Sequence, residues 1–96
     1  MKRIIWSEDA ISDYENNIDY LLINYGVNEA QEFIDEVNEV LCAISEMPEL
    51  FPMSDYRDIR KCVVRKQISI FYKVGINRIE IVRFWDNRQE PKRFLL

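Results

Sequence analysis

The sequence predicts an α+β domain in which a first strand and an antiparallel helical hairpin precede three antiparallel strands. Apolar residues recur at helical spacing over residues 8–47 and alternate with polar ones over residues 59–85. A short β-branched and aromatic segment at residues 2–6 adds the first strand. We therefore expect one domain over residues 1–96, with the hairpin packed on one face of an antiparallel sheet.

Capping residues mark the ends of the two helices. Ser7 is the expected N-cap of the first helix, two acidic residues follow it, and Gly26 ends the helix. Asn28, with Gln31 three residues later, predicts a capping box for the second helix, which stops before Pro48. Because the link between them is short, the helices must run antiparallel.

Each helix carries an apolar stripe for the core and a polar face for solvent. Tyr20 and Tyr25 are expected to seat the hairpin. The stripes consist of Ile11, Tyr14, Ile18, Leu21, Leu22 and Tyr25, then Ala30, Phe33, Ile34, Val37, Leu41 and Ile44. The face opposite the second stripe carries Glu32, Asp35, Glu36 and Glu39, which we interpret as solvated.

Three strand patterns follow a proline-containing loop at residues 48–58. They span residues 59–65, 67–74 and 78–85. The last begins by alternating and becomes apolar on both sides, which is typical of a central strand. Arg83 and Trp85 are predicted to share the side of Ile79 and Ile81, which makes Trp85 a core residue.

Composition excludes several classes of protein and site. The 96 residues, 48% of them hydrophobic, suffice for one core, and no apolar run approaches the ~20 residues of a membrane span. No signal core precedes the acidic residues that follow Ser7, so we expect a cytoplasmic location. Histidine is absent, which excludes histidine-dependent catalysis, and we expect no metal and no cofactor. Cys42 and Cys62 are predicted to be buried, reduced thiols.

Charge is divided unequally along the chain, although its net value is only −4. Residues 1–56 hold two basic and thirteen acidic residues, a net charge of −11. Residues 57–96 hold eleven basic and four acidic residues, a net charge of +7. Either the basic residues protect strand edges, or they form a face for phosphates or an acidic protein segment.

Several segments together resemble the RelE/ParE superfamily of bacterial type II toxins over nearly the whole chain. They are the strand ending at Trp6 and Ser7, the helical hairpin, the strand opened by Arg60 and Lys61, and residues 70–74 and 81–91. The resemblance implies a growth-arresting toxin that a cognate antitoxin holds inactive in a hetero-oligomer. RelE-like members cut messenger RNA on the ribosome, whereas ParE-like members poison DNA gyrase. An inactive member would only bind its antitoxin.

The residues at the family's site positions favour the ParE-like branch. Arg88 matches the family arginine that follows the last strand. Arg60 falls on the first of two strand lysines of RelE-like toxins, but the second falls on Cys62 and a middle-strand arginine falls on Ser69. Since losing one charged group from such a site costs orders of magnitude in rate, we expect a gyrase inhibitor rather than a nuclease.

Two sets of candidate site residues follow. A nuclease would use Arg60, Lys61 and Arg88 as its cations, with Tyr72, Glu80, Asp86 or a lysine of shifted pKa for proton transfer. The set expected to bind the target or the antitoxin is Arg60, Lys61, Arg65, Arg83, Asp86 and Arg88. An antitoxin anchored by these cations should bind more weakly as salt increases.

Overall fold

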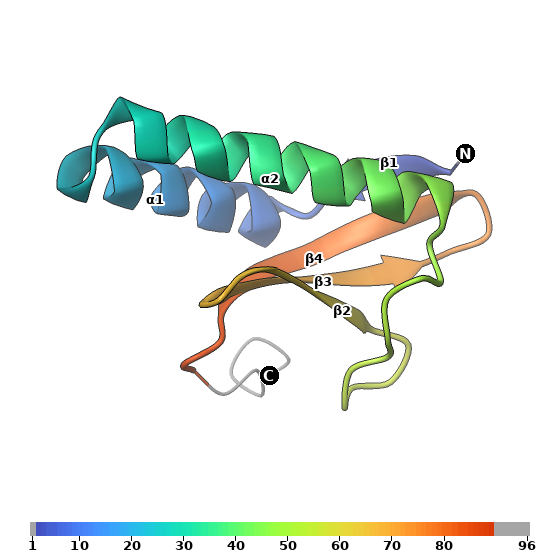
Figure 1. Cartoon of the computed structure of the whole chain (residues 1–96). Helices are drawn as coiled ribbons and strands as arrows, with labels where there is room; N and C mark the ends of the chain where they lie inside the picture. The colour runs from blue at the N-terminus through green and yellow to red at the C-terminus, as the bar shows by residue number, and fades with distance from the viewer. Residues whose placement is uncertain (1, 90–96) are drawn as a thin grey trace.

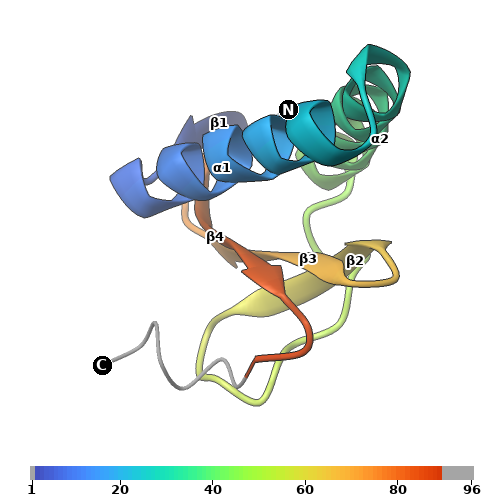
Figure 2. The ribbon, with the colours of Figure 1, turned by 90° about the vertical axis from the view of Figure 1, so that its left-hand side faces the viewer.

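The computed structural model describes residues 2–89 as two layers, a helical hairpin over a four-stranded sheet (Figure 1). The hairpin consists of α1 (Glu8–Asn24) and α2 (Val27–Glu46). The strands are β1 (Arg3–Trp6), β2 (Arg60–Arg65), β3 (Ile68–Val74) and β4 (Arg78–Asp86). Viewed from the end, the hairpin lies over one face of the sheet, and we call the opposite face the outer face (Figure 2). The predicted fold class is confirmed. Neither described helix is long and apolar enough to cross a membrane.

The strand order is β1-β4-β3-β2, with β1 parallel to β4 and the other neighbours antiparallel. The sheet is therefore mixed, not wholly antiparallel as the sequence led us to expect. The hairpin and two strands separate β1 from β4 in the chain, and so long a crossover allows a parallel pair. As a result the first strand of the chain lies beside the last.

The helix ends follow the sequence at three of four positions. The Ser7 hydroxyl accepts a hydrogen bond from the Ala10 amide at 3.0 Å, and α2 stops at Glu46. Gly26 adopts φ 101°, a conformation that L side chains rarely take, and it serves both as the end of α1 and as the N-cap of α2. The expected capping box is wrong, because α2 begins before Asn28 and the Gln31 amide instead donates to Asp35.

The core lies between the hairpin and the sheet. Its buried residues include Ala10, Leu21, Ala30, Phe33, Val37, Ile44, Cys62, Ile70, Tyr72, Ile79, Ile81 and Phe84. Two predictions fail at its margin. Tyr20 and Tyr25 are 58% and 67% exposed, in the last turn and at the C-cap of α1. Cys42 is exposed on α2, while Cys62 is buried, and both thiols are free.

A bulge in β4 reverses the faces of its last residues. Phe71 pairs with Arg83 and Tyr72 with Ile81, so Val82 is an extra residue in β4. An extra residue moves each later side chain to the other face of the sheet. Arg83 and Trp85 therefore lie on the outer face, not beside Ile79 and Ile81 as predicted. Trp85 is still buried, in a second cluster with Ile59 and Phe71.

Candidate functional site

The candidate residues lie at two opposite ends of the sheet. Arg60 pairs with Tyr72 at the start of β2, whereas Arg65 pairs with Ile68, which in turn pairs with Asp86 at the end of β4. At ~3.3 Å per strand residue, about 16 Å separates the two ends. Arg60 and Lys61 therefore lie at one end of the sheet and Arg88 at the other, so the set expected for a nuclease is divided.

Arg60 and Tyr72 hold the loop that connects α2 to β2. The Arg60 Nη1 donates to the Phe51 carbonyl at 2.7 Å, and the Tyr72 hydroxyl donates to the Pro48 carbonyl at 2.7 Å. Tyr72 is fully buried on the helix-facing side, and burial raises its pKa. Its hydroxyl is thus committed to the loop and is closed to a substrate.

Lys61 lies on the outer face, where its Nζ is 5.8 Å from the centre of the Phe71 ring. Ser69 follows on the same face of the neighbouring strand and is fully buried. Its hydroxyl makes no hydrogen bond to another described residue. The position where RelE-like toxins keep an arginine is therefore neutral and covered.

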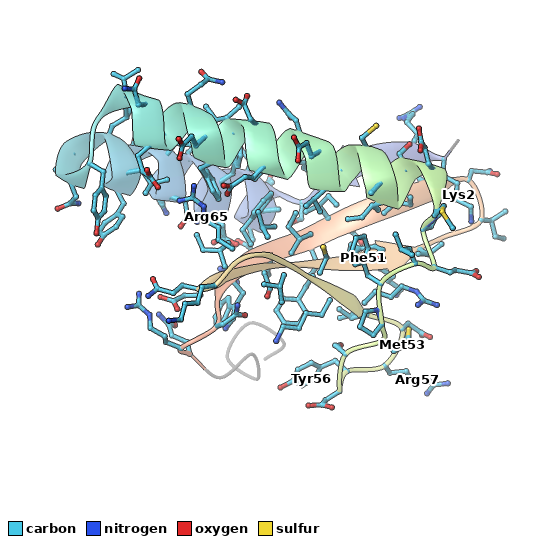
Figure 3. All side chains as sticks on the ribbon, viewed as in Figure 1. Lys2, Phe51, Met53, Tyr56, Arg57 and Arg65 are labelled. Carbon is cyan, nitrogen blue, oxygen red and sulfur yellow. The ribbon has the colours of Figure 1, made fainter. Side chains whose placement is uncertain are left out.

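Arg65 ties the end of β2 to α2. Its Nε and Nη2 donate to the two carboxylate oxygens of Glu36 at 2.6 and 3.2 Å, and its Nη1 donates to Glu29 at 3.2 Å. The guanidinium also lies 5.5 Å from the centre of the Phe33 ring. Figure 3 shows Arg65 between the hairpin and the sheet. The hydrogen bond with Glu36 raises the pKa of Arg65. Because Glu36 binds Arg65, the acidic face of α2 is not purely solvated, contrary to what the sequence had led us to expect.

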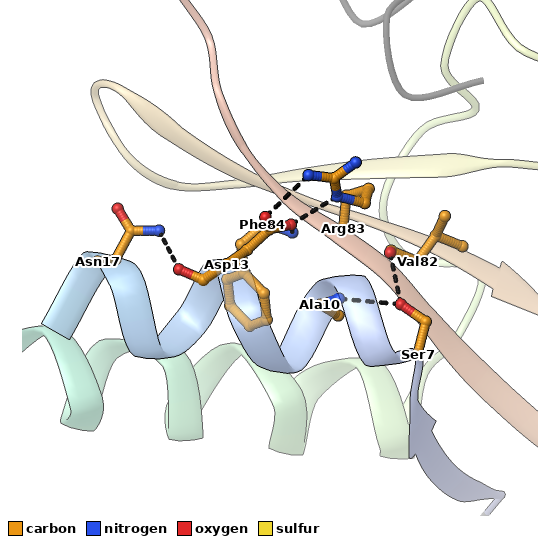
Figure 4. A network of polar contacts seen from close by, with 7 residues as sticks. All are labelled: Ser7, Ala10, Asp13, Asn17, Val82, Arg83 and Phe84. Atoms are coloured by element: carbon orange, nitrogen blue, oxygen red, sulfur yellow. Dashed lines mark hydrogen bonds and ion pairs between the residues drawn. The ribbon is translucent and has the colours of Figure 1, made fainter. Parts of the chain in front are cut away.

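Arg83 is tied to α1 in a similar way (Figure 4). Its Nε and Nη2 donate to the Asp13 carboxylate at 2.7 and 2.9 Å, and the Phe84 amide donates to the same carboxylate at 3.1 Å. The Ser7 hydroxyl donates to the Val82 carbonyl at 2.8 Å. Since β1 ends at residue 6, these side chains of α1 and its cap satisfy the edge of β4 that β1 leaves open.

Asp86 and Arg88 form a local, exposed pair beyond β4. Asp86 accepts from the Arg88 amide at 2.9 Å, from Nε at 3.0 Å and from Nη2 at 2.6 Å. The hydrogen bond from the Arg88 side chain lowers the pKa of Asp86. With 69% of its side chain exposed, Arg88 is far more open than Arg65 at 22% or Arg83 at 21%.

A groove of about 520 Å³ opens beside Arg88. It lies between the hairpin turn and the turn that joins β2 to β3. Six of the residues that line it are Tyr20, Leu21, Tyr25, Lys66, Ile68 and Arg88. From the sequence we expected the two tyrosines to seat the hairpin, and no groove was predicted beside them. Gly26, which directly follows Tyr25, was the available signal in the sequence. It marks the turn between the two helices, where side chains are less covered than in the middle of a helix.

A sequence model of the family described as "ParE toxin of type II toxin-antitoxin system, parDE" matches residues 4–91. The chain belongs to the ParE toxin family. No curated protein matches it.

Solved structures share the ParE-family fold at low sequence identity. The chromosomal ParDE toxin–antitoxin system from P. aeruginosa superposes with a TM-score of 0.77 at 17% identity, over 90% of this chain and 96% of that one. The YoeB dimer from Staphylococcus aureus gives 0.64 at 20% identity, over 88% and 94%. The E. coli DinJ–YafQ complex gives 0.62 at 10% identity, over 92% and 96%. The same fold therefore occurs in the ParDE, YoeB and DinJ–YafQ structures, and the chemistry must be argued from the site.

Proposed function

We propose that this ParE-family toxin arrests growth by poisoning DNA gyrase, catalyses no reaction of its own, and is neutralised by a cognate antitoxin. The observation that carries the proposal is the commitment of three candidate cations to internal contacts. Arg60 holds the connecting loop, Arg65 binds two glutamates, and Arg83 binds Asp13.

A metal-free ribonuclease would need different geometry. It requires a proton acceptor, a proton donor and cations grouped around one phosphate. The Tyr72 hydroxyl is buried and bonded to Pro48, and Asp86 has a lowered pKa, which makes its carboxyl a poor proton donor. Lys61 and Arg88 lie at opposite ends of the sheet. These contacts support a toxin that acts by binding.

The exposed cations are assigned to recognition. Lys61 on the outer face is proposed to contact the target, and Arg88, oriented by Asp86, is proposed to contact the antitoxin. Arg60, Arg65 and Arg83 then serve as positioning residues for the surfaces around them. An antitoxin partner is supported by similar structures that are described as the ParDE system and the DinJ–YafQ complex.

The decisive measurement is a gyrase supercoiling and DNA-cleavage assay with toxin released from its antitoxin. We expect loss of supercoiling and accumulation of cleaved DNA. Lys61→Glu should weaken inhibition by about tenfold, because it reverses a recognition charge. Arg57→Glu, which reverses an exposed charge on the connecting loop, is the matched control and should inhibit normally.

Three results would contradict the proposal in different ways. Unimpaired gyrase, together with cuts in translated messages at the ribosomal A site, would assign the toxin to the RelE-like branch. Unimpaired gyrase with normal growth during antitoxin-free expression would identify an inactive antitoxin-binding module. Equal inhibition by the Lys61→Glu variant and the wild type would remove the outer face from target recognition.

A further inference from the structure

We infer that the groove beside the hairpin turn is a docking site for an acidic segment of the antitoxin that carries an apolar anchor residue. The inference rests on the antitoxin partnership proposed above and is independent of the gyrase target. We call this surface the turn groove, and define it by Tyr20, Tyr25, Lys66, Ile68 and Arg88.

Exposed apolar side chains are concentrated at the hairpin turn. Tyr20 is 58%, Ile23 82%, Tyr25 67% and Val27 71% exposed, all within eight residues of the chain. Tyr20 and Tyr25 line the turn groove itself, and apolar side chains exposed close together mark an interaction site in a small protein. Aromatic residues are also enriched at the energetically important positions of protein interfaces. The turn therefore has the surface of a protein contact.

The two tyrosines pack against each other, and the residues around them are held by the core and by ion pairs. Their ring centres are 6.3 Å apart in an edge-on arrangement. Leu21, which also lines the groove, is buried in the core, and Ile68 packs against the core from the sheet side. Arg65, which also lines the groove, binds Glu29 and Glu36 and so fixes the sheet side to α2. An incoming side chain would meet a groove that is already formed, which lowers the entropy cost of binding.

The charges of the turn groove select an acidic segment. Glu29 is bound by Arg65 and Asp86 by Arg88, so both acids near the groove are already paired. Lys66 is exposed and makes no ion pair with another residue in 2–89. Arg65 and Arg88 are held by these acids, so Lys66 is the unpaired cation among the described residues that line the groove. Carboxylates on a partner would complete this arrangement.

Two other occupants fit less well. α1 and α2 together contain eleven acidic residues and no basic residue. A nucleic acid carries a charge at every phosphate and extends beyond the groove, so the hairpin would repel it along its length, whereas a short segment contacts the groove alone. A second copy of the chain docking symmetrically would bring the same cations face to face. A short segment with a carboxylate for Lys66 and an apolar side chain for the two tyrosines fits the groove better.

The test measures the dissociation constant of the antitoxin encoded beside the toxin, for full-length toxin variants at several salt concentrations. Tyr25→Ala should weaken binding at least about tenfold at every salt concentration, since it removes an apolar anchor. Lys66→Glu should weaken binding about tenfold at low salt and less at high salt, because salt screens an exposed charge. Ile76→Ala, at a 91% exposed residue in the β3–β4 turn, and Arg57→Glu are the matched controls and should bind like the wild type.

The same variants are then assayed against gyrase. Retained inhibition by Tyr25→Ala and Lys66→Glu, with weakened antitoxin binding, supports the inference. Antitoxin binding within twofold of wild type for both variants overturns it, and lost gyrase inhibition in that case would assign the groove to the target. If the wild-type toxin does not inhibit gyrase at all, the antitoxin measurements still decide the role of the groove. Circular dichroism of each variant shows that any loss of binding is not a loss of folding.

Discussion

Arg83 and Arg88 each donate hydrogen bonds from two guanidinium nitrogens to an aspartate, but only one of the two pairs connects distant parts of the fold. Arg83 joins β4 to Asp13, 70 residues earlier in the chain, and the two side chains are only 21% and 14% exposed. Arg88 binds Asp86, two residues away, with 69% and 31% of the side chains exposed. The first pair fixes α1 to the sheet, whereas the second only orients a side chain that stays available to a partner. Burial and sequence separation, more than residue type, decide which arginine is structural.

The largest effect is expected from breaking the long-range pair. Asp13→Ala leaves the Arg83 guanidinium and the Phe84 amide without their acceptor in a partly buried site. Such a loss should lower the free energy of unfolding by about 3 kcal/mol, measured by urea denaturation. Asp19→Ala removes an exposed carboxylate from the same helix and is the control. Equal stability of the two variants would mean that α1 is held by packing alone.

An intermediate effect on stability is expected at Arg65, because its ion pairs are more exposed than Arg83–Asp13 and less exposed than Arg88–Asp86. Its own side chain is 22% exposed, but those of Glu29 and Glu36 are 39% and 41% exposed, so solvent screens the pair. Arg65→Ala should therefore lower the free energy of unfolding by about 1–2 kcal/mol in the same urea experiment. Arg65→Lys should recover only part of this, because lysine cannot bind both glutamates in a planar fork. A cost for Arg65→Ala above that of Asp13→Ala would reverse the proposed ranking.

The smallest effect on stability is expected at Arg88. Arg88→Ala should leave the urea midpoint unchanged, but the pKa of Asp86 should rise towards its ordinary value of 3.8. In the wild type the lowered pKa means that the pair's small contribution is present above about pH 4 and is lost as pH falls through the folded-state pKa. Carboxyl carbon chemical shifts followed by NMR between pH 2 and about 6 report this pKa directly. An Asp86 pKa that is identical in variant and wild type would show that the pair does not form in solution.

Local signals were enough to predict most of the fold. Ser7 caps α1 because a side-chain oxygen at that position can reach the amide three residues on, and Gly26 stops α1 because its backbone needs a positive φ. Both features depend on a few neighbouring residues. The parallel pairing of β1 with β4 was not predicted, since it depends on contacts between residues about 75 positions apart.

The candidate site was harder to predict, for a physical reason. One extra residue at Val82 turns Arg83 and Trp85 to the outer face, and an alternating pattern contains no mark of a bulge. Arg60 and Arg65 look like exposed strand cations in the sequence, but carbonyls of the connecting loop and glutamates of α2 bind them in the fold. The number of basic residues in the second half of the chain can be read from the sequence, whereas the residue that pairs with each of them depends on the fold.

The position of β1 beside β4 has a consequence for how the toxin is made. β1 is synthesised before the other strands, yet among the strands of residues 2–89 it pairs with β4 alone, so Arg3 has no partner until Arg78 has been made. Contacts between such distant segments form late, because a long loop has to close before they contribute. A ribosome translating this chain therefore carries an incomplete sheet until β4 has left the exit tunnel. The delay separates translation of the toxin from the appearance of its folded surface.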